Sequence, residues 1–242
     1  MLDFYLYTNI GNREVNEDSI GVEKCGDTLY FFLADGLGGH GKGDAASQLT
    51  VGKAKEYIRL HHAAPINFPS LFQFCQDALM QEQENERCCS QMKTTLTTIR
   101  IDNKSFQWAH IGDSRIYYFR RGRLLIRTLD HSVPQMLVNS REIKEKEIRN
   151  HEDRNKLLKV IGAEWNTNPC EVSRNYTRKS KEAFLLCSDG FWENINEEQM
   201  RKCLKKSKSA EEWLLMMRDI VMINGAEVNM DNNSAITILL KK

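Results

Sequence analysis

Short apolar segments, separated by turns of only a few residues, are the feature that most restricts the fold of this sequence. Residues 94–102 alternate and are rich in threonine and isoleucine, a turn around Asn103 follows, and residues 106–111 lead back. Residues 115–119 and 124–129 flank a second short turn in the same way. Turns this short join antiparallel neighbours, whereas parallel strands need a long crossover. The chain is therefore expected to build antiparallel sheets.

Further strands and helices are expected on both sides of these hairpins. Apolar residues at i, i+3, i+4, i+7 and i+8 from Leu71 predict an amphipathic helix. Other helices are expected at 44–62, twice within 133–150, and at 197–206 and 210–224. Other strands are expected at 2–7, 19–23, 28–35, 171–177, 183–188 and 235–240. Strand hairpins at both ends with helices segregated between them favour an α+β fold over a parallel α/β sheet.

The length and charge of the chain fit one globular domain. Its 242 residues contain only four prolines and no Gly/Ser-rich linker, so residues 1–242 are expected to form a single domain. The 34 basic and 33 acidic residues leave a net charge of +1, which argues against nucleic-acid and membrane partners. No signal peptide and no run of roughly 18 apolar residues is present. A soluble, cytoplasmic protein is expected.

An aspartate stands at one end of several apolar segments. Three of these segments end in an acid, at Asp35, Asp113 and Asp189, and Asp18 and Asp231 each stand just before a strand. One such aspartate is usually a turn residue. Five of them indicate carboxylates that rigid strand ends carry into one cleft. Carboxylates that converge without basic partners repel one another and need cations, and hard oxygen ligands suit Mg²⁺ or Mn²⁺.

The seven cysteines give no sign of a zinc or disulfide framework. None forms a CxxC pair, and Cys75, Cys187 and Cys203 lie within apolar segments. Reduced thiols in the core are expected, so any metal must be held by oxygen atoms.

The glycine-rich segment 36–43 admits two other interpretations, and its context rejects both. It fits the G-x-G-x-x-G pattern of a dinucleotide site, but that site needs a parallel βαβ unit, and Asp35 would repel a pyrophosphate. It also nearly fits a P-loop, but Gly43 stands where the hydroxyl that binds Mg²⁺ is required.

Six short polar motifs follow one another along nearly the whole chain. They are REVNED at 13–18, ADGLGGH at 34–40, HIGDSR at 110–115, DHS at 130–132, LCSDG at 186–190 and DNNS at 231–234. Each motif alone is modest, but six in this order are highly specific. Together they resemble the PPM family of metal-dependent serine/threonine protein phosphatases, in particular its short bacterial type.

The resemblance implies a four-layer sandwich of two antiparallel β-sheets flanked by α-helices, with a metal cluster at one end. Asp35 would bridge two Mn²⁺ or Mg²⁺ ions. Asp189 and Asp231 would complete the shell of one ion, and the Gly36 carbonyl and waters that of the other.

The remaining acids would have weaker roles in this metal cluster. By the resemblance, Glu17 and Asp18 act largely through metal-bound waters, and Asp113 with Asp189 holds a third, more weakly bound ion. Two cations about 3.5–4 Å apart can share one water and orient the resulting hydroxide for in-line attack on a phosphate.

Two further residues suit phosphate chemistry. The fork-shaped guanidinium of Arg13 can bind two phosphoryl oxygens, although it could instead only neutralise Glu14 or Glu17 at the surface. His40, in the loop after Asp35, could protonate the leaving alkoxide, although a lone loop histidine is more often structural. Within the full motif set, the functional interpretation is favoured for both.

The predicted function is hydrolysis of phosphoserine and phosphothreonine in proteins by a monomer that opposes a serine/threonine kinase of the same cell. The alternative is a non-catalytic module of the same fold that binds phosphoproteins. The complete set of acids favours catalysis, because a binding module has no need for so many uncompensated carboxylates. Residues 133–158, dense in both signs of charge, would form the family's flap beside the active site, although the pattern alone fits a solvated helical face.

Overall fold

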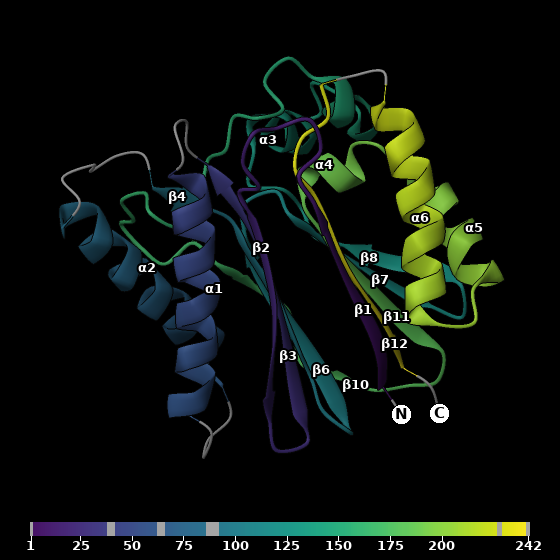
Figure 1. The fold of residues 1–242 in the computed structure, drawn as a ribbon, viewed down its shortest axis with the longest axis horizontal. Helices are drawn as coiled ribbons and strands as arrows, with labels where there is room; N and C mark the ends of the chain where they lie inside the picture. Colours follow the sequence, from purple (N-terminus) through teal and green to yellow (C-terminus); the bar gives the residue numbers. More distant parts are fainter. Residues whose placement is uncertain (1, 38–41, 62–65, 86–91, 227–228, 241–242) are drawn as a thin grey trace.

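Two antiparallel sheets stacked face to face form the centre of the protein (Figure 1). A computed structural model of the chain describes residues 2–37, 42–61, 66–85, 92–226 and 229–240. The first sheet has the strand order β1 (Leu2–Asn9), β12 (Asn233–Leu240), β11 (Glu182–Cys187), β7 (Arg115–Arg120) and β8 (Arg123–Arg127). Its β1 and β12 pair along their whole length, from Leu2 opposite Leu240 to Asn9 opposite Asn233.

The second sheet holds the other strands. Its order is β10 (Tyr176–Thr177), β6 (Ser105–Ile111), β5 (Leu96–Ile101), β3 (Thr28–Leu37) and β2 (Asp18–Cys25). Two short strands lie beside this path: β4 (Lys93–Thr94) pairs with β3, and β9 (Glu171–Val172) pairs with β6.

Helices cover the outer face of each sheet and complete four layers (Figure 1). The second sheet is covered by α1 (Gly43–Leu60) and α2 (Phe68–Asn85), and the first by α5 (Glu197–Lys206) and α6 (Ala210–Gly225). Three apolar cores follow: one lies between the sheets and one under each pair of helices. The expected α+β sandwich of two antiparallel sheets is confirmed.

The two short helices expected within 133–150 are present, as α3 (Val133–Asn139) and a 3₁₀ helix, η1 (Glu145–Asn150). Two other local features differ from what the sequence predicts. The strand expected at 171–177 is two separate two-residue strands, because between them the Trp108 N–H donates to the Ser173 side chain instead of a backbone carbonyl. A four-residue helix, α4 (Asp189–Trp192), follows β11 and is too short to leave a periodic pattern.

The described part of the chain contains no helix with the length and apolar character needed to span a bilayer.

Candidate active site

Two of the predicted aspartates face each other on neighbouring strands. Asp18 opens β2 and pairs in register with Asp35 near the end of β3, so their side chains share one face of the sheet. The Asp35 N–H donates to Thr95 Oγ1 at 2.9 Å, and its carbonyl accepts from Thr95 N at 2.9 Å and from Thr94 Oγ1 at 2.8 Å. These three hydrogen bonds fix the point from which the Asp35 carboxylate projects.

Asp18 is buried, and only one of its carboxylate oxygens has a partner. Oδ2 accepts a hydrogen bond from Ser188 Oγ at 2.8 Å, whereas Oδ1 has no partner among the described residues. Burial raises the pKa of the Asp18 carboxyl to about 7. A buried oxygen without a donor is costly unless water or a cation meets it. This atom therefore marks a position where a ligand would be favourable.

Asp189 and Asp231 reach the same place from the first sheet. Asp189 opens α4, where the Gly190 N–H donates to its Oδ1 at 2.6 Å, and Asp231 lies just before β12. Gly190 has no space for a side chain, because a Cβ there would lie 2.2 Å from the carbonyl oxygen of Asn232. Burial, followed by the charge of Asp231, raises the pKa of Asp189 to about 6.

The aspartates repel one another. Burial, and then the charge of Asp189, holds the pKa of Asp35 well above its usual range, and Asp18, Asp113 and Asp231 add to this effect. Burial and the charge of Asp189 also hold the pKa of Asp113 well above its usual range. A cluster of oxygen donors that resist ionisation, one of them a buried oxygen without a partner, fits hard divalent cations such as Mn²⁺ or Mg²⁺.

Gly36 and Glu17 lie beside this cluster. The Gly36 N–H donates to the Glu17 carbonyl at 3.0 Å, and β3 continues through Gly36 to pair with β4, so the expected loop begins later. A Cβ on Gly36 would lie 2.1 Å from the Gly43 carbonyl oxygen, so only glycine fits. Burial raises the pKa of Glu17, whose carboxylate accepts a hydrogen bond from the Gly43 backbone. His40 lies outside the described residues.

Arg13 binds an acid that the sequence did not indicate as its partner. Its Nε and Nη2 donate to the two carboxylate oxygens of Asp231, at 2.9 Å and 2.6 Å. The sequence suggested Glu14 or Glu17 as the surface partner. The residue expected to bind phosphate and a residue expected to bind metal therefore form one ion pair at the edge of the cluster.

Asn232 is a structural residue of the site that sequence reasoning missed. Its Nδ2 donates to the carbonyls of Ile10 and Val15 at 2.7 Å and 3.0 Å, and its Oδ1 accepts the Glu17 N–H at 2.8 Å. One side chain thus ties the segment that carries Arg13 to the start of β12. Asparagine in a turn is too common for its type to reveal this role.

A buried arginine supports the loop that carries Asp113. Arg115 makes two hydrogen bonds to Asp130, at 2.8 Å and 2.6 Å, and its guanidinium lies 3.3 Å from the ring centre of Trp192. Trp192 Nε1 in turn donates to the Asp113 carbonyl at 3.1 Å. The loop is therefore fixed to α4, which Asp189 opens.

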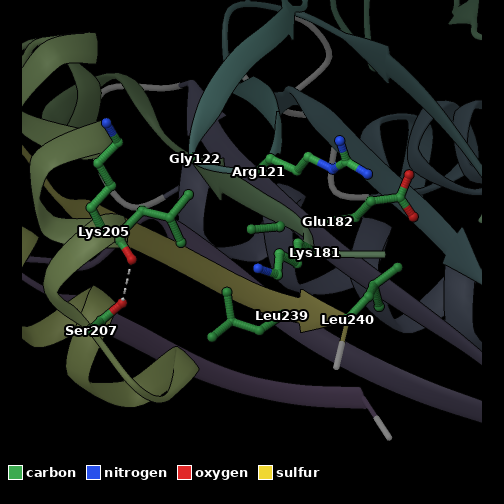
Figure 2. Close-up of a pocket in the computed structure, with 10 residues that line it drawn as sticks. Arg121, Gly122, Lys181, Glu182, Lys205, Ser207, Leu239 and Leu240 are labelled. Atoms are coloured by element: carbon green, nitrogen blue, oxygen red, sulfur yellow. Dashed lines mark hydrogen bonds between the residues drawn. The ribbon is translucent and has the colours of Figure 1, made fainter. Parts of the chain in front are cut away.

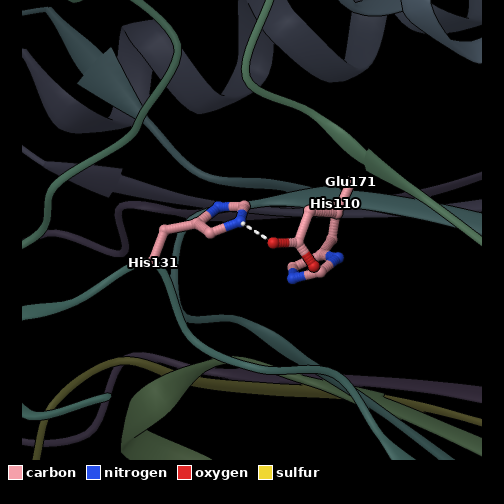
Figure 3. Close-up of side chains that lie close together, drawn as sticks. All are labelled: His110, His131 and Glu171. Carbon is pink, nitrogen blue, oxygen red and sulfur yellow. Dashed lines mark ion pairs between the residues drawn. The ribbon is translucent and has the colours of Figure 1, made fainter. Parts of the chain in front are cut away.

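A group of two histidines and a glutamate supports the same loop from the other side (Figure 3). The rings of His110 and His131 stack with their centres 4.9 Å apart, and Glu171 lies 3.1 Å from His131 Nε2. His131 Nδ1 accepts the Gly112 N–H at 3.1 Å, so in neutral His131 the proton sits on Nε2, facing Glu171. No lone pair of His131 is left for a metal. We interpret this group as a support for the turn at Gly112 and Asp113.

A cavity of about 440 Å³ borders the acids on the side of the predicted flap. Arg149 and Arg154, from η1 and the segment after it, line this cavity together with Asp189, Asp231 and Glu193. Burial, and then the charge of Asp189, raises the pKa of Glu193 to about 7. The flap segment and the aspartate cluster therefore share one opening.

Comparisons with known proteins agree with this geometry. The family described as protein phosphatase 2C matches residues 7–219. A serine/threonine phosphatase, stp, of Listeria welshimeri is 31% identical over 208 residues, which cover 83% of this chain and 81% of that protein. The crystal structure of the Mycobacterium tuberculosis serine/threonine phosphatase PstP/Ppp is 25% identical and has a TM-score of 0.86, with 100% of this chain and 99% of that chain covered.

A second solved structure with this fold contains metal ions. The catalytic domain of the serine/threonine protein phosphatase PstP in complex with two manganese ions is 23% identical to this chain, with a TM-score of 0.83 over 100% of this chain and 99% of that one. The similarities in sequence and in fold extend over most of the chain, and the resemblance seen in the six motifs is confirmed. The chain belongs to the protein phosphatase 2C family.

Proposed function

We propose that this protein is a metal-dependent phosphatase that hydrolyses phosphoserine and phosphothreonine monoesters in proteins, with its active site at the aspartate cluster. One observation carries the placement of the site: four aspartates from distant segments converge and raise one another's pKa values. Once its carboxyls ionise, such a cluster is costly unless cations compensate the charge. A non-catalytic phosphoprotein-binding module would gain nothing from this repulsion.

Each carboxylate would have a different role in metal binding. Asp35, central to the repulsion, would bridge two ions, with Asp189 and Asp231 completing one shell and the Gly36 carbonyl the other. Manganese in a solved relative of the same fold supports Mn²⁺ as one of the ions that this donor set accepts. Asp113, with Asp189, would hold a third ion. Glu17 and Asp18 would act through waters, in accord with the free Oδ1 of Asp18.

The protein's own groups bind and orient the phosphate. When bound, the divalent ions supply Lewis acidity, which neutralises phosphate charge and lowers the pKa of water. The Arg13 fork binds both carboxylate oxygens of Asp231, an acid that would also hold a metal ion. Metal binding at Asp231 would therefore release the Arg13 guanidinium, which can then hold two phosphoryl oxygens. His40 would give a proton to the leaving serine or threonine oxygen.

The proposal also covers the domain organisation of the protein, its partners and its location. The chain would act as a single catalytic unit with 133–158 as its flap, because β1 and β12 join the two ends of the sequence in one sheet. It would work as a monomer that opposes a serine/threonine kinase. A cytoplasmic location is supported by the described cysteines, all of which are free thiols, as a reducing compartment keeps them.

Substitution of the bridging acid tests the proposal. Asp35→Asn keeps the size of the side chain but removes its charge, so we expect hydrolysis of p-nitrophenyl phosphate with Mn²⁺ to fall by a factor of about 10³ or more. The matched control is Asp27→Asn, an exposed acid in the β2–β3 turn, which should keep the normal rate. Activity of the unmodified protein that survives thorough chelation would contradict the metal mechanism. A near-normal rate for Asp35→Asn would contradict the assignment of Asp35.

A further inference from the structure

A second cavity, of about 690 Å³, lies at the end of the first sheet opposite to the aspartates. Figure 2 shows the side chains that line it. Its lining combines apolar groups with three basic side chains and one carboxylate: Leu204, Leu239, Leu240, Ala183, Arg121, Lys181, Lys205 and Glu182. Strand β11 runs from this cavity to the active site, since Glu182 is its first residue and Asp189 follows its last. Six residues of strand place the two sites roughly 20 Å apart.

The positive charges of this distal basic cavity are not compensated within the described residues. Arg121, Lys181 and Lys205 form no ion pair there, and neither do their exposed neighbours in the sequence, Arg123, Lys179, Lys206 and Lys208. The carboxylate of Glu182 accepts instead from Tyr118 Oη at 2.6 Å and from the Lys179 N–H at 2.8 Å. Like charges that gather without counter-ions repel one another.

The backbone holds two of these cations in an unfavourable conformation. Arg121 has φ 51° and Lys181 has φ 60°, the left-handed region that glycine and asparagine prefer. The Arg121 N–H donates to the Lys181 carbonyl at 2.8 Å, which fixes the two turns to each other. The methylenes of Lys205 lie over Gly122, where a Cβ would come within 3.2 Å of Lys205 Cε. Strained residues of this kind cluster at functional sites.

We propose that the distal basic cavity docks an acidic segment of the phosphoprotein substrate, with acidic side chains on the rim and an apolar side chain on the leucine floor. This inference rests on the proposed function. A membrane surface would need large apolar groups that protrude, but Leu240 is buried and Leu204 and Leu239 are partly buried. A single-stranded nucleic acid would need aromatic rings for stacking, and none lines this cavity. The dipole of α5 accounts for basic residues in its last turn only, Lys205 and Lys206.

The separation of the two sites limits which substrates can use both. An extended chain spans at most about 3.3–3.6 Å per residue, so about 6 residues cover the straight distance and about 10 are needed to pass around the surface. Substrates with an acidic segment at least about 10 residues from the phosphorylated residue should therefore be favoured.

Two synthetic peptides test this docking. The first is a short phosphothreonine peptide, and the second adds a flexible linker of about 12 residues and an acidic segment with one leucine. The measured quantity is the docking ratio, kcat/KM of the long peptide divided by that of the short one, with Mn²⁺ present. A few exposed ion pairs should give a docking ratio of about five to ten at low salt, and a lower one at high salt.

The double variant Arg121→Gly/Lys181→Gly removes two rim charges and relaxes both backbones. It should fold at least as stably as the unmodified protein, because glycine accepts these φ values without strain. We expect its docking ratio to fall toward one, with hydrolysis of the short peptide unchanged. The matched control is Lys24→Gln/Lys104→Gln, which removes the same number of positive charges at two exposed lysines outside this cavity and outside the flap segment, and which should keep the full docking ratio.

A docking ratio of one in the unmodified protein, or one that the double variant retains, would overturn the docking proposal. Binding to vesicles of anionic lipid that the double variant loses, without a peptide effect, would assign the surface to a membrane and also overturn it. Failure of the short peptide to react would instead count against the proposed function. The two failures are therefore distinguishable.

Discussion

Arg13 and Asp231 form an ion pair whose two members are assigned different tasks. Arg13→Ala removes the two-pronged contact to the phosphate, and charge-assisted hydrogen bonds of this kind are worth about 1.5–3 kcal/mol. We therefore expect kcat/KM for a phosphothreonine peptide to fall by a factor of about 10–100, while the affinity for Mn²⁺ does not fall, because Asp231 loses a competing partner. Steady-state kinetics at several Mn²⁺ concentrations measure both effects. Weaker Mn²⁺ binding in this variant would show that Arg13 supports the metal site.

Asn232 offers a second test at the scale of one residue. Asn232→Ala removes three hydrogen bonds, namely those to the carbonyls of Ile10 and Val15 and the one from the Glu17 N–H. A hydrogen bond contributes about 0.5–1.5 kcal/mol net, so the loss of three should lower the free energy of unfolding by about 2–4 kcal/mol. Urea denaturation measures it, with the exposed turn residue Asn103→Ala as the control, for which a change below about 0.5 kcal/mol is expected. Equal losses in the two variants would contradict the role of Asn232.

The residues of the site differ in how well the sequence could indicate them. Asp35 and Asp189 were predictable because an acid followed by glycine at the end of an apolar strand is a local pattern. The pairing of Arg13 with Asp231 was not, because 218 residues separate them and one sequence contains no distances. The bonds of Asn232 are hidden for the same reason. Ligand types can be found locally, whereas their partners depend on the tertiary fold.

Two glycines show how differently the elements tolerate a side chain. Gly36 in β3 has no room for a Cβ, whereas a Cβ on Gly52, exposed in the middle of α1, would meet nothing within 4 Å. Gly36→Ala should lower the free energy of unfolding by about 1–3 kcal/mol or more, and Gly52→Ala should raise it by roughly 0.5–1 kcal/mol. Chemical denaturation of both variants compares the same change in two places. A stable Gly36→Ala protein with normal activity would contradict the close approach of Gly36 to Gly43.

Elements were predictable where the chain repeats a period and obscure where it does not. The alternation in β5 and the helical period in α2 each extend over enough residues to be recognised. Helix α4 has four residues and strands β9 and β10 have two each, too few for any period to show. Their existence depends on contacts with β12 and β6, which come from distant parts of the chain.

Charge is separated along the whole molecule. Carboxylates gather at one end of the first sheet, and basic side chains without ion pairs gather around the cavity at its other end. The net charge of +1 conceals this separation, because it averages over both ends. The argument from net charge against nucleic-acid and membrane partners therefore describes the average over the molecule and not either surface.

The stability of the whole protein should depend jointly on pH and metal. Burial raises the pKa of Asp18 to about 7 and of Asp189 to about 6, from an unfolded value of about 3.9. A carboxyl with a raised folded pKa contributes stability that is full below the unfolded pKa and is lost as pH rises through the folded pKa. Divalent cations offset this loss. The rise in Tm caused by Mn²⁺ should therefore grow between about pH 5 and pH 7.5.

Thermal melts with Mn²⁺ and with a chelator, at both pH values, measure this growth. Burial lowers the pKa of His131 to about 4, so protonation of His131 in acid destabilises the folded protein. The stability that depends on His131 therefore rises with pH, opposite to that of the aspartates. Because this change is the same with and without metal, it cancels in the Tm difference caused by Mn²⁺. A Tm difference that stays constant or shrinks with rising pH would contradict the assignment of the aspartates as cation ligands.

The pairing of β1 with β12 has a consequence for protein synthesis. Asp18 and Asp35 leave the ribosome well before Asp231 and β12, because Asp231 comes 196 residues after Asp35 in the sequence. A nascent chain can form the β2–β3 hairpin long before it has a complete set of acids. Phosphatase activity should therefore begin only after the last strand has left the exit tunnel, and no ribosome-bound fragment that stops before β12 could remove a phosphate.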